Sequence, residues 1–291
     1  MPAPISSTAL LPQFSGFLFP RRGTPVVANS ALVQQINAAK NKIKGVDPSQ
    51  YKQIRLVLPT GGTLNIVHFP AQGDNPTIVF SNGVGADINC GYGFCASAQE
   101  KGYGVLLYDY PGVGLSTPRF FELLKQSPQQ LESSIKQSLG WASDYLEKQG
   151  VPTSKQILAG WSFGTGVTIN LAQQKSFKAV VLLSPFSSLP NVLTFLATRL
   201  METRNDFSPY FHRYFNDILN NVGNAPMIKS PALVVLGEKD VIIPPEHSRH
   251  VFEALGSPFK KLLVLPEATH YNFNKSKTYH ETLIDFLEGL K

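Results

Sequence analysis

Short continuous apolar runs recur along the chain from residue 77 onward, and longer amphipathic stretches separate them. A strand that is buried on both faces produces such a run, because neither face meets water. The stretches between the runs, notably residues 128–149 and 246–255, are long enough for helices. This alternation predicts an α/β protein with a mostly parallel central sheet and helices on both faces. The expected strands are residues 78–80, 105–108, 157–159, 179–183, 233–236 and 262–265.

The pattern is different before residue 77. Residues 54–58 and 64–69 are expected to form two strands joined by a Pro- and Gly-containing turn, with His68 as an ordinary strand residue. Apolar residues at helical spacing predict a helix over residues 30–44. We therefore expect an N-terminal extension with one helix, residues 1–50, followed by a single domain, residues 51–291.

Residues 187–229 do not fit the simple alternation, because they are too long for a bare crossover between two strands. Their aromatic residues recur at helical spacing. One interpretation is a pair of extra helices packed on the sheet. The other is a small helical cap over an active site, in which Phe207, Phe211 and Phe215 bind the acyl part of a substrate.

Residues 155–166 carry the strongest chemical signal. An apolar run ends in Gly160-Trp161-Ser162-Phe163-Gly164, after which a helix can begin. A serine in such a strand–turn–helix context forms a nucleophile elbow, and glycine fits the crowded positions on either side because it has no Cβ. Ser162 is the candidate nucleophile. The alternative is a glycine-rich turn in which the serine only caps the helix.

A serine nucleophile needs a base, and the base needs a carboxylate that orients it. One known order of these groups along a chain is Ser, then Asp or Glu, then His, with the last two in loops after late strands. Asp240 follows the run 233–236, and His270 follows the run 262–265. Each alone also fits an ordinary turn residue or an exposed loop histidine. Together they predict the triad Ser162, Asp240 and His270.

The same chemistry needs two N–H groups that stabilise the oxyanion of a tetrahedral intermediate. The residue after the nucleophile, Phe163, is expected to supply one. The loop 81–86 follows an early strand and contains two glycines, and Val84 is the candidate for the second donor. A glycine-rich connection without a catalytic role is the alternative for this loop.

From about residue 53 to its C-terminus, the sequence resembles the α/β-hydrolase family. The resemblance rests on Ser81-Asn82-Gly83 and on the segments 108–116, 160–164, 237–240 and 268–270. Within the family, the chain is most similar to small-capped serine hydrolases that include protein depalmitoylases and monoacylglycerol-lipase-like esterases. This implies that Ser162 is the nucleophile, Asp240 the acid and His270 the base. It also implies that Asp109 braces a turn and does not belong to the triad.

Two positions depart from the family pattern. Where the family usually has His-Gly, this chain has Asn82-Gly83, and we expect the asparagine to brace the loop by hydrogen bonding. The membrane-resident depalmitoylases carry an N-terminal cysteine cluster for acylation, and this N-terminus contains no cysteine. We therefore do not expect acylation there.

Composition narrows the partners. The net charge is +6, but the basic residues are scattered, so a nucleic-acid partner is not expected. No apolar run reaches the ~20 residues of a membrane span, and we expect a cytoplasmic protein. Arg21 and Arg22 follow a mildly apolar start and leave peripheral membrane contact open.

Cys90 and Cys95 are expected to be buried in a reducing compartment. No metal is expected, because His247 and His250 lack a third ligand, and no cofactor is expected, because the triad chemistry needs none.

These observations predict a serine hydrolase that cleaves an ester or thioester through an acyl-enzyme, with a small-molecule or acylated substrate. The alternatives are a non-catalytic binding protein with the same fold, and an acyltransferase or amidase that uses the same triad. The sequence does not indicate the oligomeric state.

Overall fold

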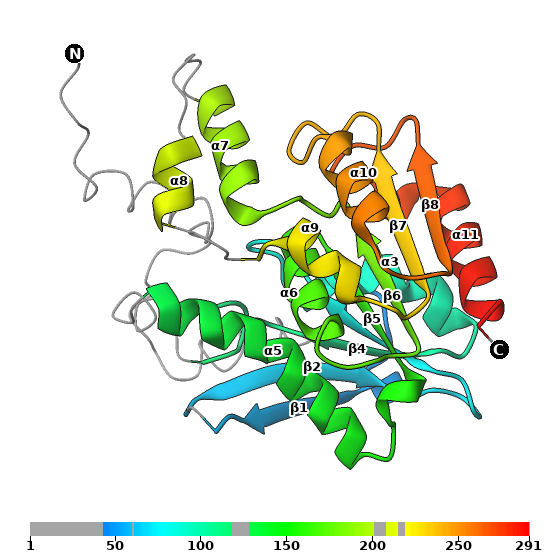
Figure 1. The fold of residues 1–291 in the computed structure, drawn as a ribbon. Helices are drawn as coiled ribbons and strands as arrows, with labels where there is room; N and C mark the ends of the chain where they lie inside the picture. Colours follow the sequence, from blue (N-terminus) through cyan, green and yellow to red (C-terminus); the bar gives the residue numbers. More distant parts are fainter. Residues whose placement is uncertain (1–42, 60, 118–127, 201–207, 215–218, 291) are drawn as a thin grey trace, which may run out of the picture.

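A computed structural model describes residues 43–59, 61–117, 128–200, 208–214 and 219–290 (Figure 1). The helix expected over residues 30–44 lies outside this part of the chain except for its last two residues. Phe207 and Phe215 also lie outside it.

The centre of the molecule is an eight-stranded sheet with the order β1-β2-β4-β3-β5-β6-β7-β8. Strand β2 runs antiparallel to both of its neighbours, β1 and β4, and its pairing with β1 forms the expected hairpin, whereas β3 to β8 are parallel to one another. Every strand predicted from the sequence is present. The strands are β1 Lys52–Val57, β2 Thr63–Phe69, β3 Thr77–Ser81, β4 Gly104–Tyr108, β5 Gln156–Trp161, β6 Ala179–Leu183, β7 Ala232–Gly237 and β8 Lys260–Leu265.

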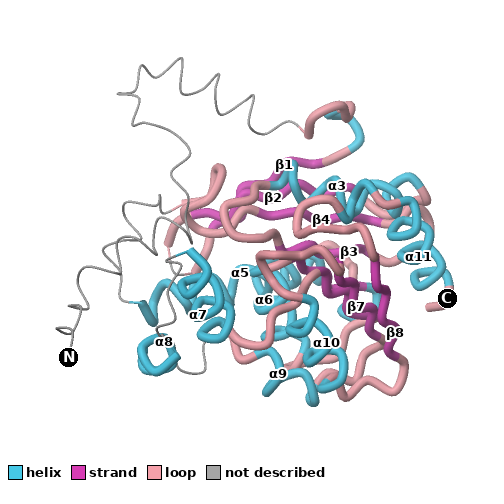
Figure 2. The backbone as a smooth tube through the Cα atoms, turned by 90° about the horizontal axis from the view of Figure 1, so that it is seen from above, coloured by secondary structure: helices cyan, strands magenta, loops and turns pink. Residues whose placement is uncertain are grey.

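The apolar runs are continuous because helices cover both faces of the sheet (Figure 2). In β5, for example, Ile157 and Ala159 pack with α3 and α11, whereas Leu158 points to the opposite face and packs with α5 and α6. Alternate residues of each parallel strand therefore enter two separate cores. The covering helices are α3 Ile88–Glu100 and α11 Lys277–Glu288 on one face, and α5 Pro128–Lys148, α6 Phe163–Ala172 and α10 Pro245–Ala254 on the other.

The segment between β6 and β7 contains α7 Leu189–Leu200, α8 Ser208–Tyr214 and the short α9 Asn221–Asn224. Helices α7 and α8 lie side by side, away from the layers that cover the sheet (Figure 1). Phe186, Leu193 and Phe211 form the centre of an apolar cluster that is distinct from both sheet cores. We call this cluster, which also includes Leu189, Val192, Leu196, Ala197, Leu219 and Ile243, the cap cluster.

His68 in β2 is a strand residue, as expected, but it is more deeply buried than an ordinary polar strand position. Its side chain is 6% exposed and stands edge-on to Tyr145 with ring centroids 5.9 Å apart. Within the described part of the chain, neither ring nitrogen has a hydrogen-bond partner. Burial, assisted by the nearby charge of Lys52, lowers the pKa of His68 to about 4.

The two cysteines differ. Cys95 is buried in the core under α3, as expected, whereas Cys90 is exposed, which corrects the expectation for that residue. The helix α3 turns its Cys95 side toward the sheet, and a residue five positions earlier lies on a different side of the helix.

Among the described helices, none is long and apolar enough to cross a membrane.

Candidate active site

Ser162 stands at the sharp turn between β5 and α6. Its backbone has a φ of 56°, in the left-handed region that residues other than glycine rarely adopt. A Cβ on Gly164 would lie 2.0 Å from the carbonyl oxygen of Ser81, and a Cβ on Gly160 would lie 2.5 Å from the carbonyl oxygen of Gly164. Both glycines are therefore required by close backbone approach, as the elbow interpretation expects.

The hydroxyl of Ser162 faces His270. Its Oγ lies 2.9 Å from His270 Nε2, and the side chain makes no capping hydrogen bond to α6. Ser162 occupies the N-cap position of α6 without a side-chain capping bond, so the structure gives no support to the interpretation of a serine that only caps the helix. His270 comes from the loop after β8, and its main-chain carbonyl accepts a hydrogen bond of 3.1 Å from Trp161 Nε1. The residue before the nucleophile thus holds the loop that carries the histidine.

Asp240 lies in the loop after β7 and is 4% exposed. Its Oδ2 lies 2.7 Å from His270 Nδ1, and its Oδ1 accepts main-chain hydrogen bonds of 2.9 Å from Ile242 and Ile243. Ser184 also donates to Oδ2, at 2.7 Å. Burial acts to raise the pKa of Asp240, but the hydrogen bond and charge of His270 and the other donors outweigh it, so the pKa is lowered.

These contacts fix the protonation pattern of the histidine. An ionised carboxylate can only accept, so His270 Nδ1 carries the proton that is donated to Asp240. In the neutral ring, Nε2 is then the acceptor and faces the hydroxyl of Ser162. The structure therefore brings the three predicted residues into one hydrogen-bonded chain, in the order that a serine nucleophile requires.

The loop between β3 and α3 passes directly beside the nucleophile. A Cβ on Gly83 would lie 2.9 Å from a ring carbon of Trp161 and 3.4 Å from the Cβ of Ser162. The next residue, Val84, is half-buried in this loop. Phe163 begins α6, where the first N–H groups have no carbonyl partner within the helix. Val84 and Phe163 thus lie on the two segments that border Ser162, and their role as oxyanion donors stays a prediction.

Asn82 does not brace this loop in the expected way. Its side chain is fully buried against α3, at a place where Gly91 leaves room for it, and neither amide atom has a partner among the described residues. The loop is instead held through its main chain, because the hydroxyl of Tyr110 donates to the carbonyl of Asn82 at 3.0 Å. The brace comes from the neighbouring strand end, which local sequence does not reveal.

Asp109, expected to brace a turn, does so from the end of β4. Its carboxylate accepts from Asn65 Nδ2 at 2.8 Å and from the main-chain N–H groups of Ile88 and Leu115 at 3.2 Å. Gly114, at a φ of 53°, brings the turn against this carboxylate. Burial raises the pKa of Asp109 to about 6, against the lowering effect of these donors. Asp109 thereby joins loops around the site.

The cap cluster reaches the edge of the triad. Ile243 belongs to it, and Phe163 and Ile242 pack against it. Phe211, a predicted substrate-binding residue, is 1% exposed inside the cluster. Helices α7 and α8 thus carry an apolar cluster that borders the loops of the site, whereas α9 packs against α6 and α10, and the interpretation of a cap that binds an acyl group stays a prediction.

Other polar groups lie away from the triad. His247 Nδ1 accepts from the hydroxyl of Ser187 at 2.9 Å, and the described residues contain no group of three metal-binding side chains.

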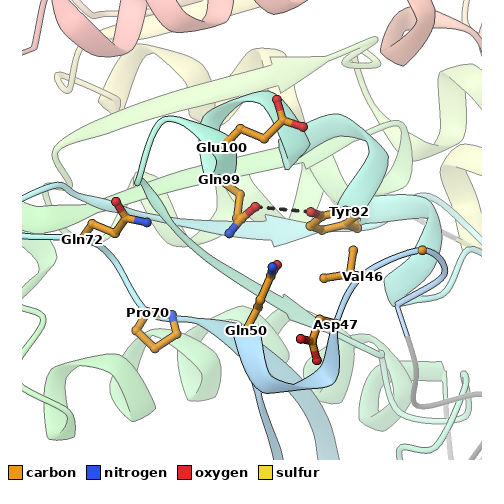
Figure 3. A pocket seen from close by; sticks show the side chains of 9 residues that line it. Val46, Asp47, Gln50, Pro70, Gln72, Tyr92, Gln99 and Glu100 are labelled. Carbon is orange, nitrogen blue, oxygen red and sulfur yellow. Dashed lines mark hydrogen bonds between the residues drawn. The ribbon is translucent and has the colours of Figure 1, made fainter.

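A pocket of about 590 Å³ lies at the amino ends of the parallel strands, and Pro70 and Glu100 are among the residues that line it (Figure 3). The triad is at the carboxyl ends, so this pocket belongs to the opposite edge of the sheet.

Ser184 is the site residue that the sequence analysis missed. It follows β6 directly, between the strands that precede Ser162 and Asp240. The available signal was a serine at the carboxyl end of a buried parallel strand, where ligands and catalytic groups gather in open α/β sheets. That signal is weak in a sequence, because nothing local shows which side chain of another loop the hydroxyl will meet.

Comparison with known proteins identifies the family. The model of the prolyl oligopeptidase family matches residues 95–290, more than half of the chain. The chain belongs to this family. The matched region contains Ser162, Asp240 and His270, and the fold is that of an α/β hydrolase.

Relatives and structures agree with this. The chain is 28% identical to the α/β hydrolase domain-containing protein aho-3 of Caenorhabditis elegans in a match that covers 75% of this chain. It is 26% identical to the mouse α/β hydrolase domain-containing protein 17C in a match that covers 72% of this chain. The match spans 59% of each of these relatives. An esterase of Pyrococcus furiosus has a TM-score of 0.66 at 17% identity, covering 85% of this chain and 97% of the esterase. The enol-lactonase of Burkholderia xenovorans has a TM-score of 0.59 at 19% identity, covering 81% of this chain and all of the lactonase. At these identities, the two structures show the fold alone.

Proposed function

We propose that this α/β hydrolase is a serine hydrolase that cleaves an ester or thioester of an apolar acyl group through an acyl-enzyme. The observation that carries the proposal is the chain of contacts from Ser162 Oγ to His270 Nε2, 2.9 Å, and from His270 Nδ1 to Asp240 Oδ2, 2.7 Å. A serine held at a positive φ beside a correctly oriented imidazole is an arrangement that structural packing alone does not require.

The reaction follows from the proton pattern. Ser162 Oγ attacks the substrate carbonyl while its proton passes to His270 Nε2. Asp240 keeps the ring in place and stabilises the imidazolium through Nδ1. The main-chain N–H groups of Val84 and Phe163 stabilise the oxyanion. His270 then returns the proton to the leaving group, and water, activated by the same base, releases the acyl group from Ser162. No cofactor takes part in these steps.

The apolar acyl group is proposed from the surroundings of the nucleophile. Phe163 follows Ser162 in the sequence, and Ile242 lies in the loop that carries Asp240. Both residues pack against the cap cluster. An acyl chain placed on Ser162 would leave water for this apolar surface, which is favourable by roughly 0.8 kcal/mol per buried methylene. Phe207, Phe211 and Phe215 remain the proposed residues for acyl selectivity.

The first test is the intact mass of the protein after exposure to a fluorophosphonate, with Ser162→Ala as the matched control. We expect one adduct on the parent protein and none on the variant. A folded parent protein without an adduct would contradict the proposal and favour the non-catalytic binding protein.

The second test separates the leaving groups. Ester, thioester and amide substrates with the same acyl chain are compared in series of increasing chain length. The prolyl oligopeptidase family takes its name from peptide-bond cleavage, so a prolyl anilide belongs in the amide series. We expect kcat/KM to be highest for the ester or thioester and to rise with chain length. Faster cleavage of the anilide would assign the triad to amide hydrolysis instead, and transfer to an added alcohol would assign it to acyl transfer.

A further inference from the structure

We propose that Ser184 is a positioning residue of the acid–base pair: its hydroxyl holds Asp240 so that the carboxylate keeps His270 in the orientation that activates Ser162. This inference rests on the proposed function. It assigns a role to a residue outside the triad, and it makes predictions that differ from those of a serine that only contributes to packing.

The position of Ser184 is well defined. It follows β6, its main-chain N–H donates to the carbonyl of Val235 in β7 at 2.8 Å, and it is 1% exposed. The hydroxyl therefore reaches Asp240 from the framework of the sheet, not from a mobile surface loop. Its hydrogen bond to Asp240 Oδ2, 2.7 Å, is as short as the one from His270 Nδ1 to the same oxygen.

The backbone of Ser184 adds an independent argument. Its φ is 47°, and only Ser162 and Leu219 share a positive φ among the described residues other than glycine. Glycine would adopt this conformation without steric cost. Serine at this position therefore strains the backbone, whereas glycine would not. What serine supplies and glycine lacks is the side-chain hydroxyl. An outlier of this kind, next to reacting groups, points to a role for the side chain.

The hydrogen bonds show what this role is. The main-chain N–H groups of Ile242 and Ile243 hold Oδ1 of Asp240, which fixes one end of the carboxylate but leaves its plane free to rotate. The hydroxyl of Ser184 supplies a third fixed point at Oδ2. Three donors from two different loops define the plane, and Oδ2 is thereby aimed at His270 Nδ1.

The same hydroxyl tunes the basicity of the pair. Oδ2 shares its negative charge between the hydroxyl of Ser184 and the ring of His270. Without the hydroxyl, the carboxylate is more basic and stabilises the imidazolium form of His270 more strongly. The acidic limb of the kcat/KM profile reports protonation of this coupled pair in the free enzyme, so it should move to higher pH.

The test compares Ser184→Ala with Ser184→Gly. Both variants lack the hydroxyl, but only glycine relieves the positive φ, so the glycine variant should be the more thermally stable of the two. We expect both to lose roughly tenfold in kcat with KM changed less than about twofold, a pattern that indicates lost transition-state stabilisation. Both should also show the acidic limb at higher pH. Ser138→Ala, which removes a buried hydroxyl that only contacts its own helix, should leave kcat and the limb unchanged.

A glycine variant with the kcat and acidic limb of the parent protein would overturn the proposal, because the loss in the alanine variant would then follow from backbone strain. NMR of the hydrogen-bonded Nδ1–H proton of His270 is the second measurement and does not need a substrate. We expect its chemical shift to change in both Ser184 variants relative to the parent protein, because the carboxylate that accepts this proton has lost a donor. An unchanged shift would refute the positioning role even if the parent protein hydrolysed none of the substrates, whereas a missing fluorophosphonate adduct on the parent protein with a changed shift would refute only the proposed function.

Discussion

Two histidines of this α/β hydrolase are equally deep in the molecule and have opposite surroundings. His270, in the loop after β8, is 3% exposed, and each ring nitrogen has a partner, Asp240 on one side and Ser162 on the other. His68, in β2, is 6% exposed, and neither ring nitrogen has a partner among the described residues. Burial is the same in both cases, so it does not decide what a histidine does.

The difference lies in what the neighbours supply. Around His270, a buried carboxylate with further donors fixes the tautomer and allows the ring to take up a proton. Around His68, an aromatic neighbour and a nearby lysine disfavour the charged form. The partners of His270 are arranged so that a proton can pass between them, whereas a buried polar group without partners, such as His68, is tolerated at a cost to stability.

The largest effect is expected from breaking the partners of His270. In Asp240→Asn, the amide oxygen can keep the N–H groups of Ile242 and Ile243, which places Nδ2 against His270 Nδ1. The ring must then accept at Nδ1 and carry its proton on Nε2, where it cannot take the proton of Ser162. We expect kcat to fall about 10⁴-fold with little change in folding, measured on the best substrate of the ester series. Asp144→Asn on α5 is the control, and a loss below tenfold would contradict the assigned role of Asp240.

The second effect concerns His68 and depends on pH. Its folded-state pKa of about 4 lies below its ordinary value of 6.5, so the folded state binds the proton less readily than the unfolded state. The stability that depends on neutral His68 is therefore complete above about pH 6.5 and is lost as pH falls toward 4, by up to about 3 kcal/mol. His68→Leu should remove this loss, as measured by urea unfolding at pH 7.5 and pH 4.5.

His280→Leu is the matched control for that experiment. The ring of His280 is held by Ser97 Oγ at Nδ1 and by the carbonyl of Asn274 at Nε2, both at 2.9 Å. We expect this variant to be less stable than the parent protein at pH 7.5, because partners lose their hydrogen bonds. If His68→Leu were destabilised as much as His280→Leu and kept the acid sensitivity of the parent protein, the contrast between partnered and unpartnered histidines would fail.

The smallest of the three effects is expected at Asp109. Like His270 it is buried and has hydrogen-bond partners, here three donors, but it does not belong to the triad. In Asp109→Asn, one carboxylate oxygen becomes an N–H₂ group that faces donors from Asn65 or Ile88. We expect a loss of about 2 kcal/mol in the free energy of unfolding at pH 7.5, from unsatisfied buried groups. Asp87→Asn should change stability little, because asparagine caps a helix as well as aspartate does and Asp87 is the N-cap of α3. Equal stability of the two variants would mean that the donors around Asp109 are dispensable.

Local signals explain what could be predicted from the sequence. Apolar runs located six of the eight strands, the Pro- and Gly-containing turn between residues 58 and 64 marked the other two, and Ser162, Asp240 and His270 follow three of the runs, where element ends are easy to recognise. The hydroxyl of Ser184 and the orphaned amide of Asn82 could not be predicted, because each depends on a residue from another loop or helix that meets it only after folding. The same holds for Cys90, whose exposure depends on how α3 is rotated against the sheet, and for the burial of Phe211 between α7 and α8.

The hydrogen bond from Trp161 to the main chain of His270 has a consequence for spectroscopy. The indole ring lies 5.3 Å from the imidazole, centroid to centroid, and the chain contains one other tryptophan, Trp141 on α5. An imidazole that gains a proton quenches the emission of an adjacent indole more strongly than a neutral one. In a Trp141→Phe background, the intrinsic fluorescence of the protein becomes an optical reporter of the charge on His270, readable without substrate, label or inhibitor.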